Sequence, residues 1–286
     1  MANKKLHLNT VIIGDALKEL NKLSDNSIDV TVTSPPYNKR NQSQGWLVTN
    51  EKYSHFDDYM PEEAYQEWQI NILNELHRVT KSGGSVFYNH KLRWVDGILF
   101  HPYQWITRSK WLVRQEIVWD RAIAANMRGW RFWQVDERLY WLYKPENGHT
   151  VGKELQSKHA KLSSIWRFRP VSRSKDHPAP FPLALPVRAI AAMPGEERKI
   201  ILDPFCGTGT TLVAAKLLGH DYIGIDISPN YVELTKNRLG ASDLEKNVVS
   251  DEISKHKIDD PFVARKKRGT ITWPYGPKTN NGETDT

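Results

Sequence analysis

A chain of 286 residues that is 39% hydrophobic can bury the core of one large domain or of one and a half smaller ones. It has no apolar run of about 18 residues and no apolar signal segment near its start, so we expect a soluble, intracellular and cytoplasmic protein. The single cysteine, Cys206, excludes a disulfide framework and a cysteine-rich zinc site, and the scattered histidines indicate no metal site.

The net charge of +7 is concentrated in the middle of the chain. Residues 108–175 contain 15 Lys and Arg against 6 Asp and Glu, and eight of the eleven tryptophans lie between Trp94 and Trp166. This composition is consistent with binding of a polyanion whose flat groups stack on aromatic side chains. It is equally consistent with a packed domain that has a solvated basic face.

The first ninety residues predict strands that alternate with helices. Pro61 suits the first turn of an amphipathic helix, and Gly83 and Gly84 are expected to end it. In chain order we expect a strand, a glycine turn and a helix start at 9–20, a buried strand at 28–33, a long loop at 38–59, a helix at 60–84 and a strand at 85–90.

The rest of the chain continues this alternation around an irregular middle. Residues 115–121 and 137–145 alternate like strands near a sheet edge, and residues 146–176 are polar, basic and irregular. Next we expect a helix at 185–197, a strand, glycine-rich turn and helix at 199–219, a strand at 221–228, a helix at 229–240 and a polar, flexible tail at 241–286. Such alternation predicts an α/β fold with a mainly parallel sheet.

The stretch TSPPY, residues 33–37, ends the strand predicted at 28–33 with a rigid elbow. Proline lacks an N–H and has a fixed φ, so two prolines cannot continue a central strand. At the carboxyl end of its strand the elbow would lie in the ligand crevice of an open α/β sheet. Tyr37 can stack on a base, while the Ser34 hydroxyl and the carbonyl groups of Ser34 and Pro35 are acceptors.

A second stretch, ILDPFCGTGTT at residues 201–211, is typical of a strand that leads through a glycine turn into a helix. Gly207 and Gly209 allow a ligand to approach the backbone, but the lysine of a phosphate-binding loop is missing. Asp226 ends the next strand, where a carboxylate can hydrogen-bond both ribose hydroxyls of a nucleoside. An adenosine without a pyrophosphate fits this pattern, and S-adenosyl-L-methionine is such a ligand.

Acceptors beside an aromatic ring suit an exocyclic amino group on a flat base. The lone pair of such an amine is delocalised into the ring, so the amine is a poor nucleophile. Hydrogen bonds from its N–H groups to Ser34 and the elbow carbonyls favour a pyramidal nitrogen that can attack a sulfonium methyl group in line. The two stretches therefore predict one amino-methylating site that needs no metal.

With both stretches in this order, the chain resembles the β-type amino-methylating DNA methyltransferases, over roughly residues 9–240. The resemblance implies a circularly permuted Rossmann-like fold that depends on S-adenosyl-L-methionine, with helices on both faces of the sheet. It implies a catalytic part at 1–145 and a cofactor-binding part of the same domain at 177–240. The implied catalytic residues are Ser34, Pro35, Pro36 and Tyr37, and the implied cofactor-binding residues are Asp15, Asp203, Pro204, Phe205, Gly207, Gly209, Thr210, Thr211 and Asp226.

The resemblance also implies how DNA is handled. The target base of double-stranded DNA has to be flipped into the pocket, and the loop 38–56 is a candidate to close over it or to fill the gap. Residues 146–176 correspond to the variable target-recognition segment of such enzymes, unless they are a basic connector. The implied DNA-binding residues are Arg167, Arg169, Arg173 and Lys175. A prokaryotic nucleoid-associated enzyme is expected, and whether a cognate restriction endonuclease accompanies it stays open.

The base that is methylated is read from Ser34. Serine before Pro-Pro resembles the N4-cytosine enzymes, whereas Asp or Asn there resembles the N6-adenine enzymes, although some adenine enzymes carry serine. We therefore expect N4-cytosine methylation, with N6-adenine methylation as the alternative. An amino-methyltransferase of RNA or protein, or a non-catalytic module that binds the cofactor and a nucleic acid, is a further alternative.

Overall fold

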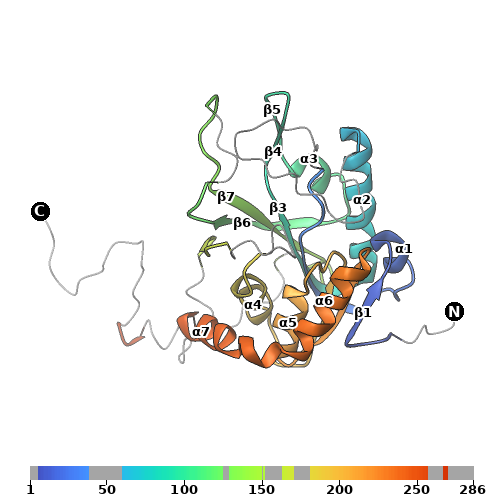
Figure 1. Ribbon diagram of the computed structural model, residues 1–286, viewed down its shortest axis with the longest axis vertical. Coiled ribbons are helices and arrows are strands. Elements are labelled where there is room, and N and C mark those ends of the chain that lie inside the picture. The colour runs from blue at the N-terminus through green and yellow to red at the C-terminus, as the bar shows by residue number, and fades with distance from the viewer. Residues whose placement is uncertain are drawn as a thin grey trace, which may run out of the picture.

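An eight-stranded sheet forms the centre of the molecule (Figure 1). The computed structural model describes residues 6–38, 60–124, 129–149, 151, 163–170, 181–256 and 267–269. Across the sheet the strand order is β1-β10-β9-β2-β3-β7-β6-β8. The bounds are β1 Thr10–Ile13, β2 Ile28–Thr33, β3 Thr80–His90, β6 Leu112–Asp120, β7 Asp136–Tyr143, β8 Ile165–Arg167, β9 Ile200–Asp203 and β10 Asp221–Asp226.

The sheet is mainly parallel, as expected for this α/β fold. Only β7 is antiparallel to its neighbours, β3 and β6. The late strands β9 and β10 lie between the early strands β1 and β2, which is the circularly permuted order. Because β7 alone is reversed, its amino end meets the carboxyl ends of all the other strands at one edge of the sheet. We call this the carboxyl edge.

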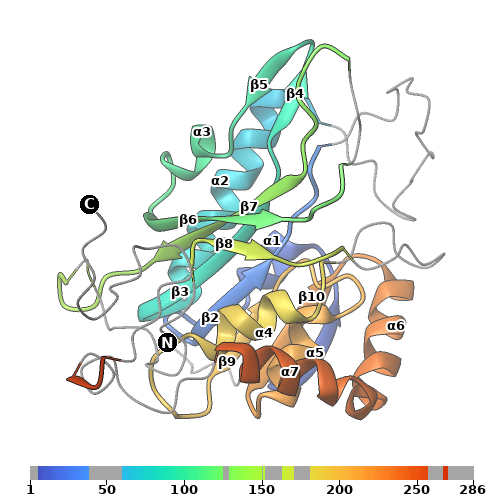
Figure 2. The ribbon, with the colours of Figure 1, turned by 90° about the vertical axis from the view of Figure 1, so that its left-hand side faces the viewer.

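Helices cover both faces of the sheet (Figure 2). Helices α4, α5, α6 and α7 pack on one face, and α1, α2 and α3 pack on the other. A separate hairpin of β4 (Arg93–Val95) and β5 (Ile98–Phe100) stands at the top of Figure 1. The bounds of the helices are α1 Ala16–Leu20, α2 Glu62–Val79, α3 Tyr103–Ile106, α4 Ala184–Ala191, α5 Thr210–Leu217, α6 Pro229–Gly240 and α7 Lys246–His256, with a 3₁₀ helix, η2, at Ser242–Glu245.

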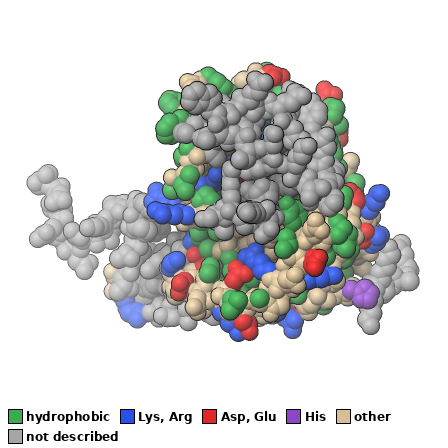
Figure 3. Space-filling view, in the orientation of Figure 1, with side chains coloured by type: hydrophobic (Ala, Val, Ile, Leu, Met, Phe, Trp, Pro, Cys, Tyr) green, Lys and Arg blue, Asp and Glu red, His purple; other side chains and the backbone are tan. Residues whose placement is uncertain are grey.

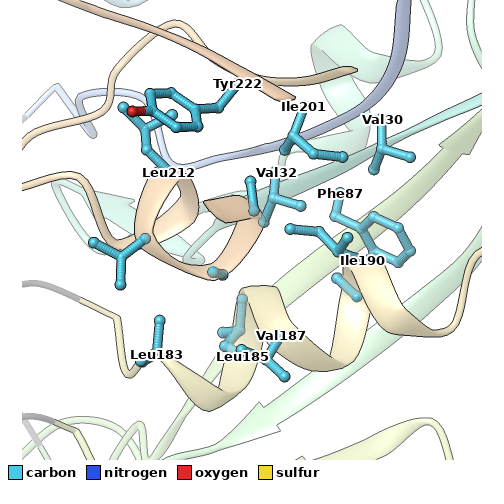
Figure 4. Packing of buried hydrophobic residues seen from close by; sticks show 14 of the residues in the cluster. Val30, Val32, Phe87, Leu183, Leu185, Val187, Ile190, Ile201, Leu212 and Tyr222 are labelled. Carbon is cyan, nitrogen blue, oxygen red and sulfur yellow. The ribbon is translucent and has the colours of Figure 1, made fainter. Parts of the chain in front are cut away.

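Alternate side chains of the central strands supply two hydrophobic cores. In β3, Phe87 points to the core under α4 and α5, whereas Val86 and Tyr88 point to the core under α2. Figure 4 shows the first core, where Val187 and Ile190 of α4 face the sheet. The sheet is therefore buried on both sides, as a mainly parallel sheet has to be. No helix within the described ranges has both the length and the apolar character needed to cross a membrane.

The helix predicted at 60–84 ends earlier than expected. Helix α2 stops at Val79, because Thr80 is already extended and its hydroxyl donates to the Leu76 carbonyl at 2.7 Å. Gly83 and Gly84 lie inside β3 and do not end the helix. At Gly84 a Cβ would lie 2.8 Å from the Asp29 carbonyl oxygen, so the glycine allows the close approach of β2.

The strands predicted at 115–121 and 137–145 are β6 and β7, and they lie near the edge that β8 forms, although β7 pairs on both sides. One further prediction about the second half is wrong. The flexible tail does not begin at residue 241, because η2 and α7 continue the fold to residue 256. Helix α7 packs on α4, with Glu252 buried and paired to Arg188 at 2.6 Å. Of the later tail only residues 267–269 are described.

Candidate active site

The two sequence motifs lie side by side at the carboxyl edge, although 170 residues separate them. The Thr33 hydroxyl at the end of β2 donates to Asp203 Oδ1 at the end of β9, at 2.8 Å. The Thr211 hydroxyl, at the start of α5, donates to the Val32 carbonyl at 3.0 Å. The fold thus joins the Pro-Pro elbow to the glycine turn by direct hydrogen bonds.

The elbow is held from behind by α2. The Pro36 carbonyl accepts from the Tyr65 hydroxyl at 2.8 Å and from Gln69 Nε2 at 3.4 Å. Gln69 also donates to Tyr65 at 2.7 Å and accepts from the Tyr88 hydroxyl of β3 at 2.8 Å. These groups are buried, so each hydrogen bond replaces one that water would make and leaves the elbow little freedom.

His90, at the end of β3, supports the aromatic ring of the elbow. Burial lowers the pKa of His90 well below its usual value, so its ring is neutral at pH 7. Its Nδ1 lies 2.8 Å from the Lys91 carbonyl and therefore carries the proton. Its unprotonated Nε2 lies 2.7 Å from the Tyr65 hydroxyl, whose single hydrogen can be donated either to this nitrogen or to the Pro36 carbonyl. The ring centre of His90 is 4.6 Å from that of Tyr37. His90 is thus in contact with the elbow and holds the ring of Tyr37.

A buried carboxylate that the sequence did not point to also lies at the elbow. Glu137, the second residue of β7, has Oε2 3.2 Å from the Tyr37 hydroxyl and 3.0 Å from Asn89 Nδ2. Its Oε1 accepts from Arg121 at 2.6 Å. Asn89 also donates to the Tyr37 hydroxyl at 2.7 Å, and the Ser34 hydroxyl lies 2.6 Å from the same hydroxyl.

The chemistry of these groups sets the direction of the hydrogen bonds. The Glu137 carboxylate can only accept, so the Tyr37 hydroxyl donates to it and then accepts from the Ser34 hydroxyl. The Ser34 oxygen also accepts from Asn89 Nδ2 at 3.3 Å, which leaves one lone pair to accept from another group. The sequence signal for Glu137 is weak, because it is the second of two adjacent acids before the apolar stretch of β7. Only the register of the sheet brings it to Tyr37.

Tyr37 itself is 9% exposed. Its ring is held by His90, and the Lys91 ammonium lies 5.3 Å from its centre. A base can reach this ring only after the ring has been uncovered. The stacking role of Tyr37 therefore stays a prediction. Residues 39–56 of the loop that was expected to close over the base lie outside the described residues.

Asp203 is the buried acid of the glycine-turn motif. Its Oδ1 also accepts from the Phe205 amide at 3.1 Å. Burial, with a smaller contribution from the Asp226 charge, raises the pKa of Asp203 to about 7. Pro204 beside it is buried, and the half-buried Phe205 ring contacts Trp68 of α2 at 5.7 Å between ring centres.

The turn after Asp203 needs its glycines. Gly207 and Gly209 have φ of +50° and +77°, and a Cβ on Gly209 would lie 2.5 Å from Thr235 Cγ2. The hydroxyl groups of Thr210 and Thr211 are used inside the protein, by Arg238 at 2.9 Å and by the backbone of β2. A cofactor would therefore meet the backbone of this turn rather than those two hydroxyls.

The end of β10 fits an adenosine. The Asp226 carboxylate accepts from the amides of Gly207 and Ser228, both at 2.9 Å, and keeps lone pairs for ribose hydroxyls. Burial raises its pKa. Ile227 follows it, and Ile13 pairs with Asp226 in the sheet; both apolar side chains are exposed and offer a surface for a flat ring.

The remaining predicted site residues are placed only in part. Asp15 lies beyond Ile13, where it caps α1 by accepting from the Lys18 amide at 3.0 Å. Arg167 and Arg169 are exposed. Residues 165–167 are not an irregular loop, because they pair with β6 as an edge strand in which Trp166 is buried. Arg173 and Lys175 lie outside the described residues.

Comparison with known proteins decides the family. A model of a family described as DNA methylase, covering N6 and N4 methyltransferases, matches residues 28–237. The chain belongs to this N6/N4 DNA methylase family. It is 31% identical over 279 residues to the type II methyltransferase M.BglII of Bacillus subtilis, with 85% of this chain and 72% of that protein covered. It is 26% identical to M.HinfI of Haemophilus influenzae, over 91% of this chain and 75% of that protein.

Two solved structures have the same fold. TTHA0409 of Thermus thermophilus, described as a putative DNA modification methylase, superposes with a TM-score of 0.59 at 25% identity, over 81% of this chain and 94% of that one. The PvuII DNA methyltransferase, described as cytosine-N4-specific, superposes with a TM-score of 0.65 at 18% identity, over 86% and 91%. The chain is thus a DNA amino-methyltransferase with DNA as its substrate, and S-adenosyl-L-methionine is the methyl donor of its family.

Proposed function

We propose that this DNA amino-methyltransferase transfers a methyl group to the N4 amino group of cytosine in a flipped-out position. When bound, S-adenosyl-L-methionine supplies an electrophilic methyl group on a sulfonium. The protein then has to hold the amine in line with that group and accept its hydrogen bonds. The residues that we assign to these tasks lie together at the carboxyl edge.

The cofactor is assigned to the ends of β9 and β10. Asp226 would bind the ribose hydroxyls, and Ile13 and Ile227 would cover the adenine ring. Asp203 and the backbone of residues 205–209 would bind the methionine part. They follow β9, which lies between β10, where the ribose would bind, and β2, which leads to the elbow, and Asp203 accepts a hydrogen bond from Thr33 beside the elbow. Asp15 would lie near the adenine.

The target amine is assigned to the elbow. Ser34 oxygen would accept one amine hydrogen, because its own hydrogen is directed to Tyr37 and, through Tyr37, to Glu137. A carboxylate at the end of this chain of hydroxyls increases the negative charge on the Ser34 oxygen and thereby favours a pyramidal amine. Tyr37 would stack on the base once DNA has uncovered the ring. Glu137 acts through Tyr37 and Ser34 and is a positioning residue.

The observation that carries the choice of base is Ser34. A neutral hydroxyl, and not a carboxylate or an amide, stands before Pro35 at the point where the amine would bind, and this residue is typical of N4-cytosine enzymes. Arg167 and Arg169 would contact phosphates beside the site, since both are exposed.

Mass spectrometry of nucleosides tests this proposal. DNA from cells that express the protein, and from cells that express the Ser34→Ala variant, is digested and analysed. We expect N4-methylcytosine with the wild-type protein and a reduced amount with the variant. N6-methyladenine alone would overturn the choice of base and keep the elbow mechanism, whereas no methylated base in any DNA would overturn both.

A further inference from the structure

Three aromatic side chains stand in solvent on the connection between β6 and β7. Trp130 is 58% exposed, Phe132 98% and Trp133 63%. We call residues 130–133 the aromatic segment. Figure 3 shows hydrophobic side chains gathered at the upper left of that face, where Figure 1 places this connection. Single exposed apolar residues are common, but three large rings within four residues indicate a surface that binds another molecule.

The aromatic segment starts and ends at the candidate active site. At its base the Arg121 amide donates to the Val135 carbonyl at 2.9 Å, and the Arg121 side chain binds Glu137 at 2.6 Å. Glu137 in turn contacts the Tyr37 hydroxyl. The segment is also attached to the β4–β5 hairpin, because the Arg131 guanidinium lies 4.1 Å from the ring centre of Trp94. Its position is thus set by the same residues that hold the elbow.

The register of the sheet brings this segment and the exposed arginines to one edge. In β6 and β8, Asp120 pairs with Arg167, so Arg167 and Arg169 lie where β6 ends and the connection begins. In β3 and β7, His90 pairs with Arg138, so the other end of the connection lies beside the elbow. DNA that contacts the arginines and delivers a base to Tyr37 would lie against this edge of the sheet, from which the connection with the aromatic segment projects.

We infer that the aromatic segment enters the DNA duplex beside the target base and that Phe132 occupies the space which the extruded base leaves. This inference rests on the proposed extrusion of the base. Extrusion leaves an apolar gap between two stacked base pairs, and a flat ring beside the pocket can restore the lost stacking. Phe132 has no polar group to desolvate and is exposed over nearly its whole surface, so it can enter the gap without loss of contacts in the protein.

The Phe132→Ala variant tests this inference. Two duplexes are compared, both containing the site at which the wild-type protein methylates DNA: one with a normal pair and one with a mismatch at the target base. A mismatched base is already poorly stacked, so its extrusion depends less on a side chain that fills the gap. We expect kcat/KM to fall about tenfold on the normal duplex and by less than about threefold on the mismatched one. Phe132→Trp should restore activity on the normal duplex.

A matched control is Leu112→Ala. Leu112 is 44% exposed at the start of β6, at the end of the strand opposite the carboxyl edge, and its substitution should leave both rates unchanged. Equal losses on both duplexes, or no loss on either, would overturn the role of Phe132.

Fluorescence of 2-aminopurine at the target position, paired with thymine so that no mismatch is introduced, separates this inference from the proposed extrusion. Wild-type protein should raise the fluorescence, and Phe132→Ala should raise it less. If the wild-type protein gives no rise, extrusion itself is wrong and the role of Phe132 is wrong with it. If both proteins give the same rise, extrusion stands and the role of Phe132 alone is wrong.

Discussion

The hydroxyl group of Tyr37 lies 3.2 Å from the carboxylate of Glu137, although the two residues are 100 positions apart in the chain. Tyr37 follows β2, Glu137 is the second residue of β7, and β3 lies between these strands. The carboxylate has an arginine on one oxygen and the elbow on the other. This arrangement makes Glu137 the terminal acceptor for the hydroxyl groups of the elbow.

Glu137→Gln should therefore slow methyl transfer. The glutamine keeps the size of the side chain but loses its charge, and its amide can donate to Tyr37 and reverse the chain of hydroxyls. Loss of a hydrogen bond to a charged group is worth about 1.5–3 kcal/mol, so we expect kcat to fall roughly 10- to 100-fold. Single-turnover rates and calorimetric binding of the cofactor should be measured together.

The binding constant should stay unchanged, because Glu137 does not contact the assigned cofactor site. Glu116→Gln, on β6 and paired with Arg138, is the control and should leave kcat as it is. A Glu137→Gln enzyme with wild-type kcat would refute the positioning role.

Asp226→Ala should weaken binding of S-adenosyl-L-methionine. The variant loses the assigned hydrogen bonds to the ribose, so the affinity should fall by about 1.5–3 kcal/mol. Isothermal calorimetry measures this directly. Asp221→Ala is a matched control, because Asp221 is an acid on the same strand but at the opposite edge of the sheet. Equal effects of the two substitutions would show that Asp226 only supports the fold.

The affinity for the cofactor should depend on pH through Asp203. Burial raises the pKa of Asp203 to about 7, so the group is mostly neutral at pH 6 and mostly charged at pH 8. The charged form attracts the positively charged cofactor. The ratio of the wild-type affinity for the cofactor to that of Asp203→Asn should therefore rise from pH 6 to pH 8. Calorimetry of both proteins at several pH values measures this ratio. A ratio that is constant from pH 6 to pH 8 would contradict the assignment.

Arg169→Ala should reduce the salt dependence of DNA binding. Each phosphate contact contributes about 0.9 to the slope of log K against log salt concentration, so loss of one contact should lower the slope by about that amount. Fluorescence anisotropy over a salt series gives the slope. Arg198→Ala, which removes an exposed arginine far from the carboxyl edge, should leave it unaltered. Identical slopes for all three proteins would exclude a phosphate contact at Arg169.

Glu252→Ala should destabilise the fold. Glu252 and Arg188 are both buried, and removal of one partner leaves a buried charge, which typically costs about 3–5 kcal/mol. Urea unfolding monitored by circular dichroism measures the loss. Asp243→Ala breaks an exposed pair with Lys246 and should not move the midpoint. If both variants unfold like the wild type, α7 does not contribute to the stability of the domain.

Local sequence was sufficient for the features that depend on neighbouring residues. Two prolines after a buried strand define the elbow at Ser34–Tyr37, and glycines that take a positive φ define the turn after Asp203. The elbow and the turn each depend on a few consecutive residues, and the strands and helices around them also follow from local sequence patterns. The order of these motifs along the chain was enough for the permuted fold and the family.

Tertiary structure decided everything that depends on the register of distant strands. Glu137 belongs to the elbow only because β7 runs antiparallel to β3, and Glu252 is buried only because α7 packs on α4. In the sequence each follows another acid, Asp136 or Asp251, in polar surroundings. The positions of the aromatic rings at 130–133 were likewise undetermined, because a tryptophan-rich stretch reads as a core until the fold leaves it in solvent. The role of such a side chain depends on the residue that the neighbouring strand or helix places beside it, and the packing of the whole chain decides which residue that is.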